Sequence, residues 1–155
     1  MKQLIRGALL ILCMTFLEVN ADPGVFVFSV DKPISEVYDK VYKSLEDARF
    51  YVVFEPNIGK NLSGFAERWG DEYNRNKLSA IRSMVFCNGW YANQVSNKDP
   101  HMLALCPLHM TLTEKDGKTT ALFARPTVIA ADSPAAEILS ELEVEVIAAI
   151  KKGMN

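Results

Sequence analysis

The sequence holds little of what the commonest enzymes use for chemistry. It has only two histidines and three cysteines in 155 residues. It contains no His-Glu-x-x-His helix for zinc, no Gly-x-Ser-x-Gly turn for a nucleophilic serine, and no Gly-x-Gly-x-x-Gly or Walker loop for phosphates. These absences argue against familiar metalloenzymes, serine hydrolases and nucleotide-dependent enzymes, and we expect a protein without catalytic activity of its own.

Basic charge is also scarce. The chain has 17 Lys and Arg against 19 Asp and Glu, a formal net charge of -2, and no stripe of basic residues. This balance argues against a nucleic-acid partner. With 49% hydrophobic and 23% charged residues, the composition is that of an ordinary globular domain rather than a disordered or fibrous chain.

Long apolar runs are absent, and the one run near the start is short. It spans residues 7–17, follows Lys2 and Arg6, and precedes Val19-Asn20-Ala21. About eleven apolar residues are roughly half of what a membrane-spanning helix needs, so the pattern predicts a secretory signal peptide cleaved after Ala21. Residues 22–155 would then be a single periplasmic domain with no membrane contact, and Cys13 would leave with the signal.

Hydrophobic periodicity indicates alternating strands and helices after the signal. Apolar positions at three-and-four spacing predict one long helix from residue 34 and another after Ser133-Pro134, whereas β-branched and aromatic runs predict strands. We expect Asp31 and Ser133 to cap the two long helices. The predicted strands cover residues 25–30, 50–54, 81–87, 103–113 and 118–124, and short helices are predicted around residues 62–69 and 90–95, with a polar loop at 71–77.

An Asp-Gly pair between two extended runs is a strong hairpin signal, because both turn positions favour positive φ. Asp116-Gly117 is such a pair, and a two-residue turn there places Leu112 opposite Ala121. The overall order predicts an α+β fold, a two-layer sandwich in which two long helices cover one face of a mixed or antiparallel sheet of about five strands. The second face would be solvated or paired with a second subunit.

The two cysteines of the mature chain, Cys87 and Cys106, lie on predicted neighbouring strands. In an oxidising compartment such a pair either forms a disulfide or stays as two buried thiols. Cys106, together with His101, His109 and Met110, also offers the soft sulfur and imidazole ligands that copper prefers. A periplasmic copper or thiol redox protein is therefore the alternative function.

Turn-forming and aromatic residues gather where predicted strands end. Cys87, Asn88, Trp90, Asp99 and Arg125 all fall at such positions. Aromatic side chains beside a few polar groups are typical of small-molecule clefts. The leading hypothesis is thus a domain that binds a small molecule or a protein partner at these residues, with no cofactor.

The order of several short motifs resembles one known family. Phe86-Cys87-Asn88 is followed by Asp99-Pro100, by Leu103-Ala104-Leu105-Cys106-Pro107 and by Asp116-Gly117. From about residue 25 to residue 152 this order resembles the domain-of-unknown-function 302 family. The resemblance implies an α+β fold, a homodimer and no established activity.

Overall fold

The computed structural model describes residues 24–155. The predicted signal peptide of residues 1–21, including Cys13, lies outside these residues. Within residues 24–155, no helix is both long enough and apolar enough to cross a membrane.

One antiparallel sheet organises the domain. Its five strands have the order β1-β5-β4-β3-β2, and every neighbouring pair is antiparallel. The hairpin register is the predicted one, because Leu112 lies opposite Ala121 and Met110 lies opposite Phe123. The strands are β1 (Val25–Val30), β2 (Tyr51–Phe54), β3 (Ala80–Cys87), β4 (Leu108–Lys115) and β5 (Lys118–Ala124).

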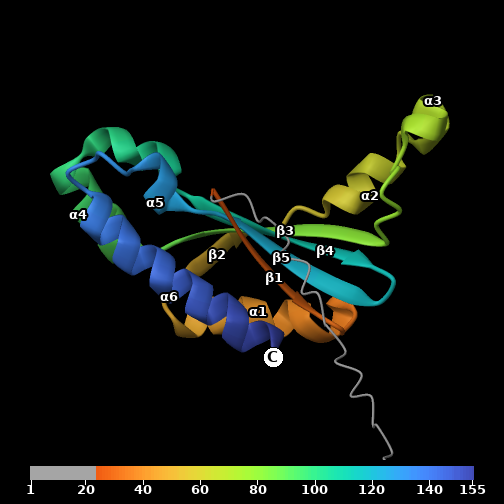
Figure 1. Ribbon diagram of the computed structural model, residues 1–155, viewed down its shortest axis with the longest axis horizontal. Coiled ribbons are helices and arrows are strands. Elements are labelled where there is room, and N and C mark those ends of the chain that lie inside the picture. Colours follow the sequence, from red (N-terminus) through yellow and green to blue (C-terminus); the bar gives the residue numbers. More distant parts are fainter. Residues whose placement is uncertain (1–23) are drawn as a thin grey trace, which may run out of the picture.

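Two long helices cover one face of the sheet and confirm the predicted two-layer α+β fold. They are α1 (Ile34–Asp47) and α6 (Ala136–Met154), and they lie side by side beneath the strands (Figure 1). Gly153 makes their close approach possible. A Cβ atom at this position would lie 2.5 Å from the Cα atom of Val41, so no larger residue fits without separating the helices.

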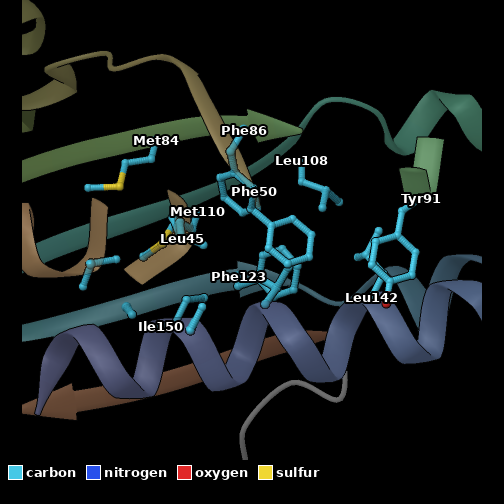
Figure 2. Packing of buried hydrophobic residues seen from close by; sticks show 14 of the residues in the cluster. Leu45, Phe50, Met84, Phe86, Tyr91, Leu108, Met110, Phe123, Leu142 and Ile150 are labelled. Carbon is cyan, nitrogen blue, oxygen red and sulfur yellow. The ribbon is translucent and has the colours of Figure 1, made fainter. Parts of the chain in front are cut away.

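The core fills the space between this helical layer and the sheet. Its largest fully buried side chains include Phe50, Phe86 and Phe123. The Phe50 ring meets Phe86 edge-on at 6.1 Å between centroids and stacks on Tyr91 at the same distance (Figure 2). Such aromatic contacts add to the free energy gained from burying apolar area.

Short helices lie at the two ends of β3. Those next to its amino end protrude on the side of the sheet away from α1 and α6, and those next to its carboxyl end close the other end of the domain (Figure 1). The first group contains α2 (Ile58–Ser63), α3 (Ala66–Trp69) and the 3₁₀ helix η1 (Gly70–Glu72), and the second contains α4 (Gly89–Lys98), the 3₁₀ helix η2 (Pro100–Leu105) and α5 (Pro126–Ile129).

The predicted strand over residues 103–113 is wrong in its first part. Residues 100–105 form η2 instead, and β4 begins only at Leu108. The Asp99 side chain accepts a hydrogen bond from the His101 backbone N–H at 3.1 Å, and Pro100 occupies the first turn. This cap starts a helical turn that packs Met102 and Leu105 against the core, which outweighs the β-propensity of the local sequence.

The predicted caps of the long helices differ from the observed ones. Pro33, not Asp31, stands at the N-cap of α1, where the Ile34 N–H donates to the Glu114 carboxylate of β4 at 2.7 Å. Helix α6 begins at Ala136, beyond the predicted cap Ser133, whose hydroxyl accepts from the Ala135 N–H at 3.1 Å.

Candidate functional site

The predicted cysteine pair comes together at the carboxyl end of β3. Cys87 is the last residue of β3, and Cys106 lies between η2 and β4. Their Sγ atoms are 3.1 Å apart, both residues are partly exposed, and both are free thiols. Burial, reinforced by the neighbouring Cys87 thiol, raises the pKa of Cys106 to about 11. Cys106 is therefore a neutral thiol at pH 7 and a weak nucleophile.

Asn88, the next candidate residue, caps a helix. Its side-chain oxygen accepts hydrogen bonds from the backbone N–H groups of Trp90 at 3.0 Å and Tyr91 at 3.3 Å, and the residue is 8% exposed. Trp90 itself points into solvent, with 67% of its surface exposed. The two residues thus stabilise and begin α4 rather than line a common cleft.

Asp99 and Arg125 are also held by partners within the protein. The Asp99 carboxylate caps η2 and accepts a second hydrogen bond from the Ser133 hydroxyl at 2.7 Å. The Arg125 Nε donates to the Glu143 carboxylate at 2.8 Å, and the Thr127 N–H and hydroxyl donate to the same carboxylate at 3.0 and 2.6 Å. Arg125 and Thr127 thus fasten the segment after β5 to Glu143 of α6, and Asp99 fastens η2 to Ser133 just before α6.

The cavity beside the two cysteines is too small for an organic ligand. A cavity of about 20 Å³ lies among Cys87, Cys106 and apolar side chains of α4, η2 and α6. This volume is close to the minimum that holds one water molecule. The cavity therefore marks a tightly packed end of the domain.

The side chains of the proposed copper set do not converge. Met110 faces the core and is fully buried, whereas its neighbour His109 is exposed on the other side of β4. His101 is exposed on η2. Within residues 24–155, no three His, Cys, Asp or Glu side chains are grouped so that they could hold a metal ion.

A much larger hollow lies at the opposite end of β3. This groove has a volume of about 730 Å³ and is formed by α2, the segment from Trp69 to Arg82 and the amino end of β3. Pockets that enclose small organic ligands measure roughly 300–1,000 Å³. The polar stretch 71–77, which the sequence indicates only as a loop, supplies much of one wall.

The groove combines cationic groups with an apolar wall. Its lining includes the basic residues Lys60, Arg75 and Arg82 and the acidic residue Glu72, which pairs with Arg75. Trp69, which stacks on Phe65 with 4.9 Å between ring centroids, contributes aromatic surface. Such a mixture favours an anionic molecule that also carries an apolar part.

Arg82 is held in place by the first helix. Its guanidinium carbon lies 3.3 Å from the ring centroid of Tyr38, and the Tyr38 hydroxyl donates to the Glu55 carboxylate at 2.8 Å. Burial and this bond to Glu55 raise the pKa of Tyr38 far above its ordinary value. The phenol stays neutral and keeps donating, so the arginine rests on a fixed aromatic ring.

Sequence reasoning missed the groove because no motif marks it. Its lining comes from α2, α3, η1 and β3, which approach one another only after folding. Gly59 allows the approach, because a Cβ atom there would lie 3.1 Å from the Ile81 backbone nitrogen. The one sequence feature that points to a binding site here is the presence of Trp69 and Tyr73 among polar residues.

The fold and these two regions define an α+β domain with one antiparallel sheet, a dithiol at one end of β3 and an open groove at the other. The chain belongs to the family described as "Domain of unknown function DUF302", whose model matches residues 26–153. It is similar to a solved structure described as "Crystal structure of uncharacterized conserved protein DUF302 from Bacillus stearothermophilus", with a TM-score of 0.72 and 19% identity over 84% of this chain and 98% of the other. At this identity the likeness concerns the fold alone. No curated protein matches the chain.

Proposed function

We propose that this protein is an exported binding domain that holds a small organic anion in the groove beside the amino end of β3 and performs no chemical step on it. The observation that carries the proposal is the groove itself, with a volume of about 730 Å³ and three basic residues against one acidic residue in its lining. The proposed site lies away from Asn88, Asp99 and Arg125, whose side chains make hydrogen bonds within the fold.

The positive charge of the groove favours a negatively charged ligand. Lys60, Arg75 and Arg82 attract a carboxylate or phosphate, and the planar Trp69 ring offers a surface for an apolar body. A series of equal shape and different charge therefore tests the idea directly. Benzoate is expected to bind more tightly than benzyl alcohol, and benzylamine should bind weakest, with the preference reduced by added salt.

The two tryptophans of the chain provide matched reporters, since Trp69 lines the groove and Trp90 is exposed on α4 at the other end of β3. In a Trp90→Phe variant only Trp69 emits, and benzoate should change its fluorescence. In a Trp69→Phe variant the remaining Trp90 signal should stay constant. An equal response of both variants, or no response at millimolar benzoate, contradicts the groove as the binding site.

A second pair of variants tests the cationic contribution. Arg75→Gln removes a lining guanidinium, whereas Arg68→Gln removes an exposed one on α3 that does not line the groove. A charge-assisted hydrogen bond contributes about 1.5 kcal/mol, so the first substitution should weaken benzoate binding about tenfold and the second should leave it unchanged. Equal losses of benzoate affinity in the two variants would mean that general surface charge, and not the groove, causes the effect.

Export is the remaining part of the proposal, and it rests on the pattern of residues 1–21. Expression of the full sequence in a bacterial host should yield a periplasmic product whose intact mass is that of residues 22–155, with Asp22 as its first residue. A product that keeps residues 1–21 and stays in the cytoplasm would refute export and would leave the binding groove untouched.

A further inference from the structure

The two thiols at the carboxyl end of β3 occupy a defined place in the chain path. Phe86 of β3 lies opposite Leu108 of β4, so the chain leaves the sheet and returns to it at nearly the same point. Cys87 and Cys106 stand at these two points, nineteen positions apart in sequence. Between them lie α4 and η2, and we call residues 87–106 the α4–η2 cap.

We propose that Cys87 and Cys106 are a redox clasp that forms an intramolecular disulfide and closes the α4–η2 cap. The Sγ atoms are 3.1 Å apart, about 1 Å more than the length of a disulfide bond. Strand pairing on one side fixes both ends of the cap, so a small movement of the side chains joins the sulfurs. The proposal is independent of the groove and of any ligand.

The surroundings of the pair suit a structural bond rather than a catalytic one. Apolar side chains of Val95, Leu105 and Leu142 line the adjoining cavity. The Cys106 thiol is weakly acidic there, as described above, because burial disfavours its thiolate. Reaction with an oxidant should accordingly be slow at pH 7 and faster at alkaline pH.

The chemistry requires a disulfide as the oxidant, and glutathione disulfide serves. One cysteine thiolate attacks a glutathione sulfur, and the first glutathione leaves as a thiolate. The second cysteine then attacks the mixed disulfide, forms the Cys87–Cys106 bond and releases the second glutathione. Two protons and two electrons leave the protein, and one glutathione disulfide becomes two reduced glutathiones.

The clasp should stabilise the protein by restricting its unfolded chain. In the chain-entropy account, closing a loop of about 20 residues raises the unfolding midpoint of a domain of this size by about 10 °C. The Asp99 carboxylate already fastens the middle of the cap to Ser133. A closed clasp would therefore hold the cap at its base as well as at its middle.

The test uses the full chain with a Cys13→Ser substitution, so that only the two clasp thiols remain. After incubation with glutathione disulfide, the intact mass should fall by two hydrogen atoms and iodoacetamide should label neither cysteine. Trypsin should then release residues 83–98 covalently joined to residues 99–115. Dithiothreitol should restore both thiols and lower the unfolding midpoint to that of the untreated reduced protein.

A matched variant identifies the intramolecular step. Cys106→Ala lacks the second thiol, so its reaction should stop at the mixed disulfide, with one glutathione on Cys87. If this variant does not fold, Cys87→Ala should carry one glutathione on Cys106 instead. Two glutathiones on the parent protein, persistent labelling of both thiols, or a disulfide between copies overturns the clasp. An unfolding midpoint that oxidation leaves unchanged or lowers overturns its stabilising role.

Discussion

Polar side chains lie at both ends of β3, and the two ends use them differently. At the carboxyl end, the side chains of Asn88 and Asp99 accept hydrogen bonds from nearby backbone groups, and the cavity that Asn88 lines measures about 20 Å³. At the amino end, Lys60 and Arg75 border a groove of about 730 Å³. The comparison teaches that a polar residue at a strand end becomes available for binding only when the local backbone does not already occupy it.

The largest expected difference between the two ends concerns their ion pairs. Glu143 is buried and accepts from Arg125 and Thr127, so Glu143→Ala should lower the free energy of unfolding by about 2–3 kcal/mol. Glu72→Ala breaks the exposed Glu72–Arg75 pair and should change the free energy of unfolding by less than about 0.5 kcal/mol. Urea unfolding measures both, and similar losses would remove the distinction between a packed end and an open end.

A smaller difference is expected between two asparagine caps. Asn88→Ala removes a buried cap that accepts two backbone N–H groups, and it should cost about 1–2 kcal/mol of stability. Asn57 caps α2 at the groove through one bond to the Lys60 N–H, and Asn57→Ala should cost about 0.5 kcal/mol because that helix is short and exposed. A reversed order would show that α2 is the more firmly held element.

The carboxyl end should also respond to acid. Burial raises the pKa of Glu143, but the hydrogen bonds from Thr127 and Arg125 outweigh it and hold the pKa below its usual value of 4.5. When the pKa of a carboxyl group is lower in the folded state than in the unfolded state, its contribution to stability is fully present above the unfolded-state pKa. That contribution is lost as the pH falls through the folded-state pKa. The urea midpoint should therefore decrease below about pH 4.5.

A Glu143→Gln variant provides the control for this acid response, because its amide does not titrate. Its urea midpoint should be lower than that of the parent protein near pH 6 and should fall less steeply below pH 4.5. The Asn88→Ala variant keeps the carboxylate and should retain the parental slope. Parallel pH profiles of the parent and Glu143→Gln would mean that another carboxylate dominates acid unfolding.

Local patterns predicted most of the fold. The apolar stripe of α1 and the Asp116-Gly117 turn depend on residues that are close in sequence, and both were confirmed, including the Leu112–Ala121 register. The strand predicted from residue 103 failed because burial of Met102 and Leu105 favours a helical turn there. That preference depends on the core, which no short window of sequence contains.

The candidate site was predictable only in part. The proximity of Cys87 and Cys106 was expected, because both residues belong to segments predicted to be neighbours, and their Sγ atoms are 3.1 Å apart. Asn88 and Asp99 were predicted to bind a ligand, and in the structure both cap helices, because residue type alone does not distinguish a cap from a ligand contact. The groove depends on how α2 lies over β3, which is a tertiary property without a local signal.

The contact between Gly153 and Val41 joins the last turn of α6 to the middle of α1. Terminal turns usually fray and exchange their amide hydrogens quickly. Here Ile150 and Met154 are fully buried, so opening of this turn exposes the core and disturbs the first helix at once. Amides in the final turn of α6 should therefore exchange nearly as slowly as those of the central strands, and the domain should open as one cooperative unit rather than peel from its carboxyl end.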